Sequence, residues 1–93
     1  MSNLELEAVR VGIFDELRAE RAKQDRKWGF PQLRSHAEWG IILAEEFGEA
    51  SKEANELHFG REELAGKLED ELVQTAAVCV SWLEHLRTCN IRG

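Results

Sequence analysis

The sequence predicts an all-α protein, an antiparallel bundle of three main helices that is completed by homo-oligomerisation. Three long stretches carry apolar residues at spacings of three and four, which is the period of an amphipathic helix. Glycine and proline separate these stretches at Gly29 to Pro31 and again at Gly60. Short connections favour antiparallel neighbours, and three long helices alone make an incomplete bundle, which a homodimer or a dimer of dimers would complete.

The first helix is expected from about Leu4 to about Lys27. The apolar residues Leu6, Val9, Ile13 and Leu17 recur at helical spacing and form one apolar stripe, and the stripes of long helices in a short chain usually need a partner subunit to cover them. The sequence Trp28-Gly29-Phe30-Pro31 then ends the helix, because proline lacks a backbone donor and disfavours helix at the residue before it.

The second helix is expected to begin at Ser35 and to end near Gly60. Ser35 and Glu38 have the spacing of a capping box, in which each side chain accepts from the other residue's backbone amide. Glycine is a common stop at the carboxyl end of a helix. The predicted apolar stripe consists of Trp39, Ile42, Leu43, Phe47, Ala50, Ala54 and Leu57.

The third helix is expected from Arg61 or Glu62 to about Leu86. The run from Val78 to Val80 is rich in β-branched residues and leaves a strand open as an alternative, but the surrounding period favours helix. The predicted stripe consists of Leu64, Leu68, Leu72, Thr75, Cys79, Trp82, Leu83 and Leu86.

Composition indicates one domain over residues 1–93, located in the cytoplasm. A net charge of −6 disfavours a general role in binding nucleic acid. The longest apolar run, from about Thr75 to Leu83, is too short to span a membrane, and the acidic N-terminus does not resemble a secretion signal. Cys79 and Cys89 lack the spacing of a zinc site, so reduced thiols are expected.

Three carboxylates gather on the second helix at Glu45, Glu46 and Glu49. At about 100° per residue, Glu45 and Glu49 lie nearly above one another and Glu46 flanks them. Glu71 is as far after Gly60 as Glu49 is before it, so antiparallel packing through this turn would bring these two acids level. Carboxylates this close repel one another unless a cation lies among them, although a solvated acidic face is the simpler alternative.

A hard divalent cation with oxygen ligands suits such a group. Mg²⁺, with Mn²⁺ as a possible substitute, binds carboxylates, retains water and neutralises polyphosphate oxygens. The acids therefore predict metal-dependent phosphoryl chemistry, which depends mainly on positioning and on charge stabilisation.

The same residues carry a family resemblance. Glu45-Glu46-x-x-Glu49, followed by Glu71-x-x-Gln74, resembles the EExxE…ExxD signature of MazG-like nucleoside triphosphate pyrophosphohydrolases, which belong to the all-α pyrophosphatase superfamily. Residues 20–29 and 42–50 are similar to short, phage-type members. The resemblance covers about residues 20–84.

The resemblance implies a homodimeric or homotetrameric helical enzyme that hydrolyses an NTP or dNTP to the monophosphate and pyrophosphate. Glu45, Glu46, Glu49 and Glu71 would be the metal ligands and catalytic residues. Gln74 stands where the family has aspartate, and its carbonyl oxygen brings no charge. A non-catalytic helical oligomer, an interaction or regulatory module with a degraded metal site, is the alternative function.

The expected substrate-binding residues are Lys27, Trp28 and Gln74. Lys27 could meet phosphate, although a single basic residue is most often a surface residue. Trp28 could stack on a nucleobase or belong to a helix interface, and the interior is the favoured place for Trp39. Glu53 is expected to face solvent.

Overall fold

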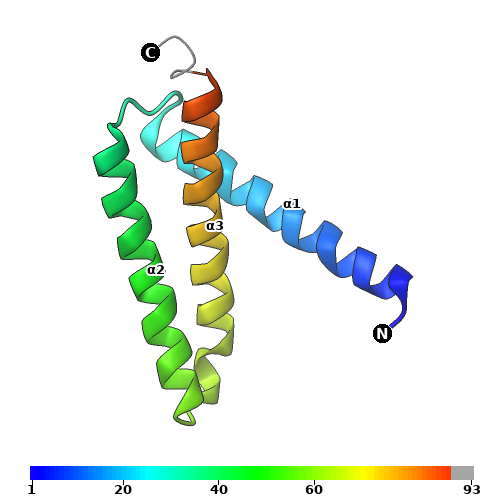
Figure 1. The fold of residues 1–93 in the computed structure, drawn as a ribbon. Helices are drawn as coiled ribbons and strands as arrows, with labels where there is room; N and C mark the ends of the chain where they lie inside the picture. Colours follow the sequence, from blue (N-terminus) through cyan, green and yellow to red (C-terminus); the bar gives the residue numbers. More distant parts are fainter. Residues whose placement is uncertain (89–93) are drawn as a thin grey trace.

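The computed structural model describes residues 1–88, which form three long α-helices and one short 3₁₀ helix (Figure 1). The helices are α1 (Asn3–Trp28), α2 (His36–His58), η1 (Glu62–Leu64) and α3 (Ala65–Thr88). No strand occurs among the described residues, so the all-α prediction is confirmed and residues 78–80 lie inside α3. Cys89 lies outside the described residues.

Local sequence signals set the ends of the helices. The predicted capping box at Ser35 and Glu38 is present, and Ser2 and Glu5 form a second one at the start of α1. Gly29 and Gly60 follow α1 and α2 with φ of 86° and 95°, a backbone conformation that glycine adopts without steric cost. The third helix differs from expectation in its first turn, which is the 3₁₀ helix η1.

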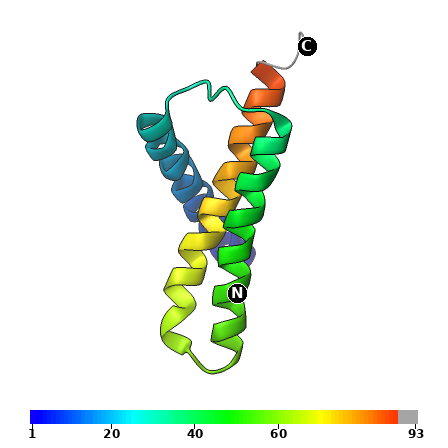
Figure 2. The same ribbon diagram turned by 90° about the vertical axis from the view of Figure 1, so that its left-hand side faces the viewer.

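Helices α2 and α3 form an antiparallel pair joined through Gly60 (Figures 1 and 2). Lys67 Nζ lies 3.1 Å from a carboxylate oxygen of Glu53, and these residues are equally far from Gly60 in the sequence. Near the other end of the pair, the rings of Trp39 and Trp82 stack with centroids 6.5 Å apart. These contacts agree with the register expected from the sequence.

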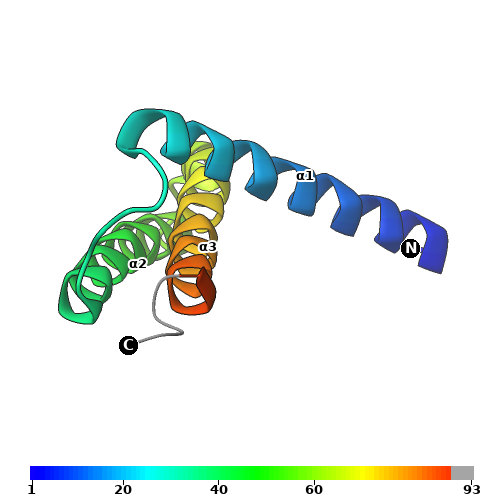
Figure 3. The ribbon, with the colours of Figure 1, turned by 90° about the horizontal axis from the view of Figure 1, so that it is seen from above.

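Helix α1 crosses α3 with its C-terminal half, and its N-terminal end projects away from the helix pair (Figures 1 and 3). The predicted apolar stripe of α1 is therefore not a buried stripe within one chain. Leu17 is half-buried, whereas Leu6, Val9 and Ile13 are 37%, 46% and 51% exposed. Helical period identifies this apolar face but not the element that covers it.

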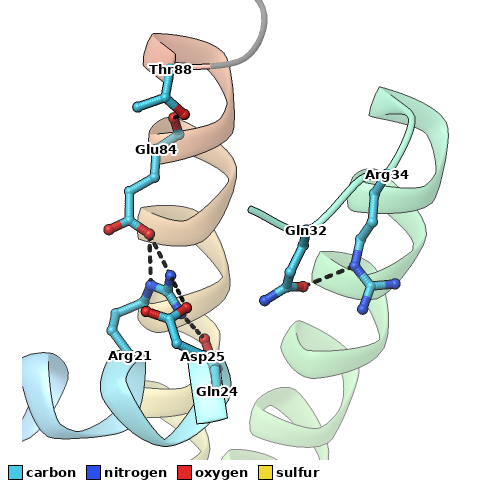
Figure 4. A network of polar contacts seen from close by, with 7 residues as sticks. All are labelled: Arg21, Gln24, Asp25, Gln32, Arg34, Glu84 and Thr88. Carbon is cyan, nitrogen blue, oxygen red and sulfur yellow. Dashed lines mark hydrogen bonds and ion pairs between the residues drawn. The ribbon is translucent and has the colours of Figure 1, made fainter. Parts of the chain in front are cut away.

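A buried guanidinium joins α1 to α3 (Figure 4). Arg21 Nε donates to a carboxylate oxygen of Glu84 at 2.9 Å, and Arg21 Nη2 donates to Asp25 at 2.8 Å. Arg21 Nη1 donates to Gln24 Oε1 at 3.0 Å. Arg21 is only 6% exposed, so these partners replace the water that the charge loses on burial.

The buried apolar core is small and consists of Trp39, Ala50, Ala77 and Val78. The predicted stripes of α2 and α3 are only partly buried: Phe47 and Ala54 are exposed, as are Leu72 and Leu83. These positions lie at the edges of a two-helix contact, which covers less of each helix than a complete bundle would. Among residues 1–88, no helix combines the length and apolar character needed to cross a bilayer.

Glu53 was expected to face solvent and is instead 2% exposed, with Lys67 as its ion-pair partner. We expect Lys67→Met to lower the urea midpoint of unfolding, because it leaves the carboxylate of Glu53 buried without a cation. Adding Glu53→Gln should recover part of this loss, since the amide is neutral. Lys52→Met, at an exposed position on α2, is the matched control. Equal midpoints for the two lysine variants would contradict the role of this ion pair.

Candidate functional site

Acidic side chains from all three long helices gather around Glu46. Glu46 is half-buried, and its Oε2 atom is buried with no hydrogen-bond partner among the described residues. Burial raises the pKa of Glu46, and the negative charges of Glu71, Glu49, Glu20 and Glu45 raise it further. Glu46 is therefore the residue at which the carboxylates of this group converge.

The structure brings together the four acids that the sequence singled out. Glu45 and Glu49 are exposed on α2, Glu71 is half-buried on α3, and all three act electrostatically on Glu46. The electrostatic coupling of Glu71 to Glu46 agrees with the antiparallel register.

Sequence reasoning missed Glu20 as the fifth member of the group. Glu20 immediately precedes Arg21, whose contact with Glu84 holds this part of α1 against α3. A signal was available, because Glu20 belongs to the stretch of α1 that carried part of the family resemblance. The helical pattern alone could not show that this end of α1 turns toward the acids of α2.

The donor chemistry of the group suits a hard divalent cation. In residues 1–88 as they stand, no group of three or more His, Cys, Asp or Glu side chains is arranged to hold a metal ion. The buried, unpartnered oxygen of Glu46 and its raised pKa are nevertheless the features that a neighbouring cation would relieve. Carboxylates are also the ligands that Mg²⁺ prefers.

One cavity beside Glu46 contains the three residues expected to bind substrate. This lysine cavity has a volume of about 330 Å³ and is lined by Glu20, Lys23, Gln24, Lys27, Trp28, Glu46 and Gln74. Lys27 Nζ lies 4.8 Å from the centroid of the Trp28 ring. Two ammonium groups thus border the same space as two carboxylates. Lys23 and Gln24 were not anticipated from the sequence.

A second cavity also reaches Glu46 and is richer in aromatic and amide groups. This tryptophan cavity, again about 330 Å³, is lined by Gln24, Trp28, Gln32, Arg34, Trp39, Ile42, Glu45, Glu46, Val78 and Ser81. Trp28 is 58% exposed, whereas Trp39 is 2% exposed and belongs to the core, as expected. The roles of Gln24 and Gln32 were missed, although these two amides flank the Trp28 helix stop.

The two cavities share Gln24, Trp28 and Glu46. Glu46 therefore lies between a space bordered by lysines and a space bordered by tryptophans. Neither cavity is lined by Glu49 or Glu71, which act on the site through their charge on Glu46. Comparison with protein-family models, with curated proteins and with solved structures found no match.

The raised pKa of Glu46 has a testable consequence for stability. A carboxyl whose pKa rises on folding stabilises the fold below its unfolded value of 4.5, and this contribution is lost as pH rises through the folded value. In the metal-free protein at pH 7, the ionised Glu46 therefore destabilises the fold. Glu46→Gln should unfold at higher temperature than the wild type at pH 7, and the difference should shrink below pH 4.5.

The measurement is thermal unfolding in a chelating buffer at several pH values. Asp15→Asn, a carboxyl-to-amide change at an exposed position of α1, is the control and should not show this pattern. A Glu46→Gln variant that is less stable than the wild type at pH 7 would contradict the electrostatic strain assigned to Glu46.

Proposed function

We propose that the protein is a Mg²⁺-dependent nucleotide pyrophosphohydrolase, which converts an NTP or dNTP to the monophosphate and pyrophosphate. The observation that carries this proposal is the position of the acids. Carboxylates of all three long helices act electrostatically on Glu46, which lines both a cavity with two lysines and a cavity with two tryptophans. Phosphates and a base are the two chemically different parts of a nucleotide, and the two cavities suit them respectively.

In this proposal Glu45, Glu46, Glu49 and Glu71 are the metal ligands and form the catalytic group. Bound Mg²⁺, or Mn²⁺ in its place, supplies charge neutralisation on the phosphate oxygens and activates water at neutral pH. Water forms a bond to the α-phosphorus while the bond between the α-phosphorus and the α–β bridging oxygen breaks. Pyrophosphate then leaves with the bridging oxygen, and the nucleoside monophosphate remains.

Lys23 and Lys27 border the cavity that would hold the phosphates. Their ammonium groups supply positive charge to the polyphosphate, and Trp28 provides an exposed aromatic face beside Lys27. Gln74 lines the same cavity and offers a neutral carbonyl oxygen. Glu20 supplies from α1 the negative charge that Gln74 does not supply from α3.

A panel of canonical and modified NTPs and dNTPs with Mg²⁺, assayed for pyrophosphate release, tests the activity. Glu46→Gln and Glu49→Gln should each lower kcat by about 100-fold or more, because each removes charge that stabilises the transition state. Glu62→Gln, at the exposed turn between α2 and α3, is the matched control and should retain activity. Activity unchanged in both site variants would refute the assignment of the site.

The neutral Gln74 also supports the alternative of a non-catalytic helical module with a degraded metal site. Thermal unfolding with and without millimolar Mg²⁺ separates the two functions. A cation that binds only the folded protein raises its stability by mass action, by about 2.7 kcal/mol at 100 times the dissociation constant. The enzyme should therefore show a rise in Tm that Glu46→Gln abolishes, whereas the absence of any shift would favour the non-catalytic module.

A homodimer or homotetramer is part of the proposal. The accessible surface of 6867 Å² exceeds the value of about 5,500 Å² expected for a folded monomer of 10.6 kDa. The radius of gyration is 15.4 Å, against about 12 Å for a compact chain of this length. An apolar cavity of about 340 Å³ opens between α1 and α3, with Val9, Ile13 and Leu72 among its lining residues. A second copy would cover these side chains.

Sedimentation equilibrium tests this association. Val9→Glu combined with Ile13→Glu should shift the protein toward the monomer, because both substitutions place charge in the apolar cavity between α1 and α3. Val11→Glu is the control, since Val11 is equally exposed but lies on the other side of α1. A wild-type protein that sediments as a monomer at all concentrations would contradict the proposal.

A further inference from the structure

Several polar side chains that line the tryptophan cavity offer hydrogen-bond donors. These donors specify the kind of base that the cavity would accept. Gln24 Oε1 accepts from Arg21 Nη1, and Gln32 Oε1 accepts from Arg34 Nε, each at 3.0 Å (Figure 4). A guanidinium can only donate, so the atom of each amide that faces it must be the oxygen. Each amide oxygen therefore already accepts one hydrogen bond from its arginine, and the NH₂ group of each amide is the donor that remains for a ligand.

The guanidinium of Arg34 is a further donor group in this cavity. Trp39 is 2% exposed, and its Nε1 atom is buried with no partner among the described residues. An indole N–H can only donate, but this atom is enclosed by protein and does not open onto the cavity. The guanidinium of Arg34 lies 5.6 Å from the centroid of the Trp39 ring and contributes donors only. A ligand that supplies acceptors would suit this guanidinium and the two amide NH₂ groups.

Carboxylates also line this cavity and supply acceptors. These are Glu45 and Glu46, which belong to the carboxylate group that the proposed function assigns to the cation. Ser81, which is buried and lines the same cavity, can donate or accept and could receive a ring N–H. Apart from these carboxylates and Ser81, the polar side chains that line the cavity and are open to a ligand are Gln24, Gln32 and Arg34, which offer donors.

Nucleobases differ in what they present to such donors. Uracil, thymine, guanine and hypoxanthine carry a carbonyl oxygen where cytosine and adenine carry an amino group. An amino group facing the amides of Gln24 and Gln32 would place donor against donor and leave both without partners. Resting on the proposed nucleotide hydrolysis, we infer that the tryptophan cavity selects nucleotides with an oxo base over those with an amino base.

Calorimetric titration of the metal-free protein with four monophosphates tests this selection without requiring hydrolysis. UMP should bind at least about tenfold more tightly than CMP, and GMP more tightly than AMP by a similar factor, because a site built from donors rejects the analogue that lacks the acceptor. Each pair compares an oxo base with an amino base of the same ring size. The comparison of UMP with GMP shows whether the cavity prefers a pyrimidine or a purine.

Gln32→Glu and Gln24→Glu test the residues responsible. Each glutamate can still accept from its arginine while replacing the donor NH₂ with an acceptor oxygen, so the preference for oxo bases should narrow or invert. Asn55→Asp makes the same chemical change at an exposed position of α2 and should leave the preference unaltered.

Equal or tighter binding of CMP and AMP, no binding of any of the four monophosphates, or an unchanged preference in both glutamate variants would each overturn the inference. Failure of the proposed function would give a different result. No triphosphate would then release pyrophosphate in the presence of Mg²⁺. Oxo-base binding without hydrolysis would leave the inference standing and remove the enzyme assignment.

Discussion

The buried guanidinium of Arg21 is the interaction on which the arrangement of the three helices depends. A charge that is 6% exposed must be paired, and Arg21 is paired with Glu84 of α3 and with Asp25 and Gln24 of its own helix. This contact holds the C-terminal half of α1 against α3, next to the acids of α2. Glu20 and Gln24 reach the site because they are close to Arg21 in the chain. The same guanidinium also orients the Gln24 amide, so one buried cation shapes both the acid group and the tryptophan cavity.

Glu53 and Glu46 are both on α2 and both at least half-buried, and each has one buried oxygen without a hydrogen-bond partner among the described residues. They differ in the charges around them. Glu53 is paired with Lys67, which makes it part of the α2–α3 contact, whereas Glu46 is acted on by four acids and has a raised pKa. A purely structural acid gains nothing from such surroundings, because they destabilise its charged form. A site that recruits a cation benefits from them, since the cation removes the repulsion on binding. The proposed metal site therefore explains a feature that is unfavourable to the isolated fold.

Exposed apolar side chains are a second feature that is unfavourable to the isolated chain. The buried apolar core is small, the N-terminal end of α1 projects away from the helix pair, and Val9 and Ile13 are exposed. A chain of this size buries a modest fraction of its surface and gains from covering such residues with a second copy. Association through α1 would leave the cavities at its other end accessible, because they lie beside Gln24 and Trp28.

The sequence by itself determined the three helices, the approximate ends of the first two, and the antiparallel pairing of α2 with α3. These features follow from local signals: helical period, the Ser35–Glu38 capping box, and glycines that adopt positive φ. It also determined that Glu45, Glu46 and Glu49 lie together, because neighbours one turn apart share a face of any helix. Only the tertiary structure decided that Glu20 joins them, that Leu6, Val9 and Ile13 remain uncovered, and that Gln24 and Gln32 border one cavity. Those outcomes depend on where α1 crosses α3, and a crossing between helices is set by packing and by the buried Arg21–Glu84 contact. The period of apolar residues along one helix does not specify where that helix crosses another.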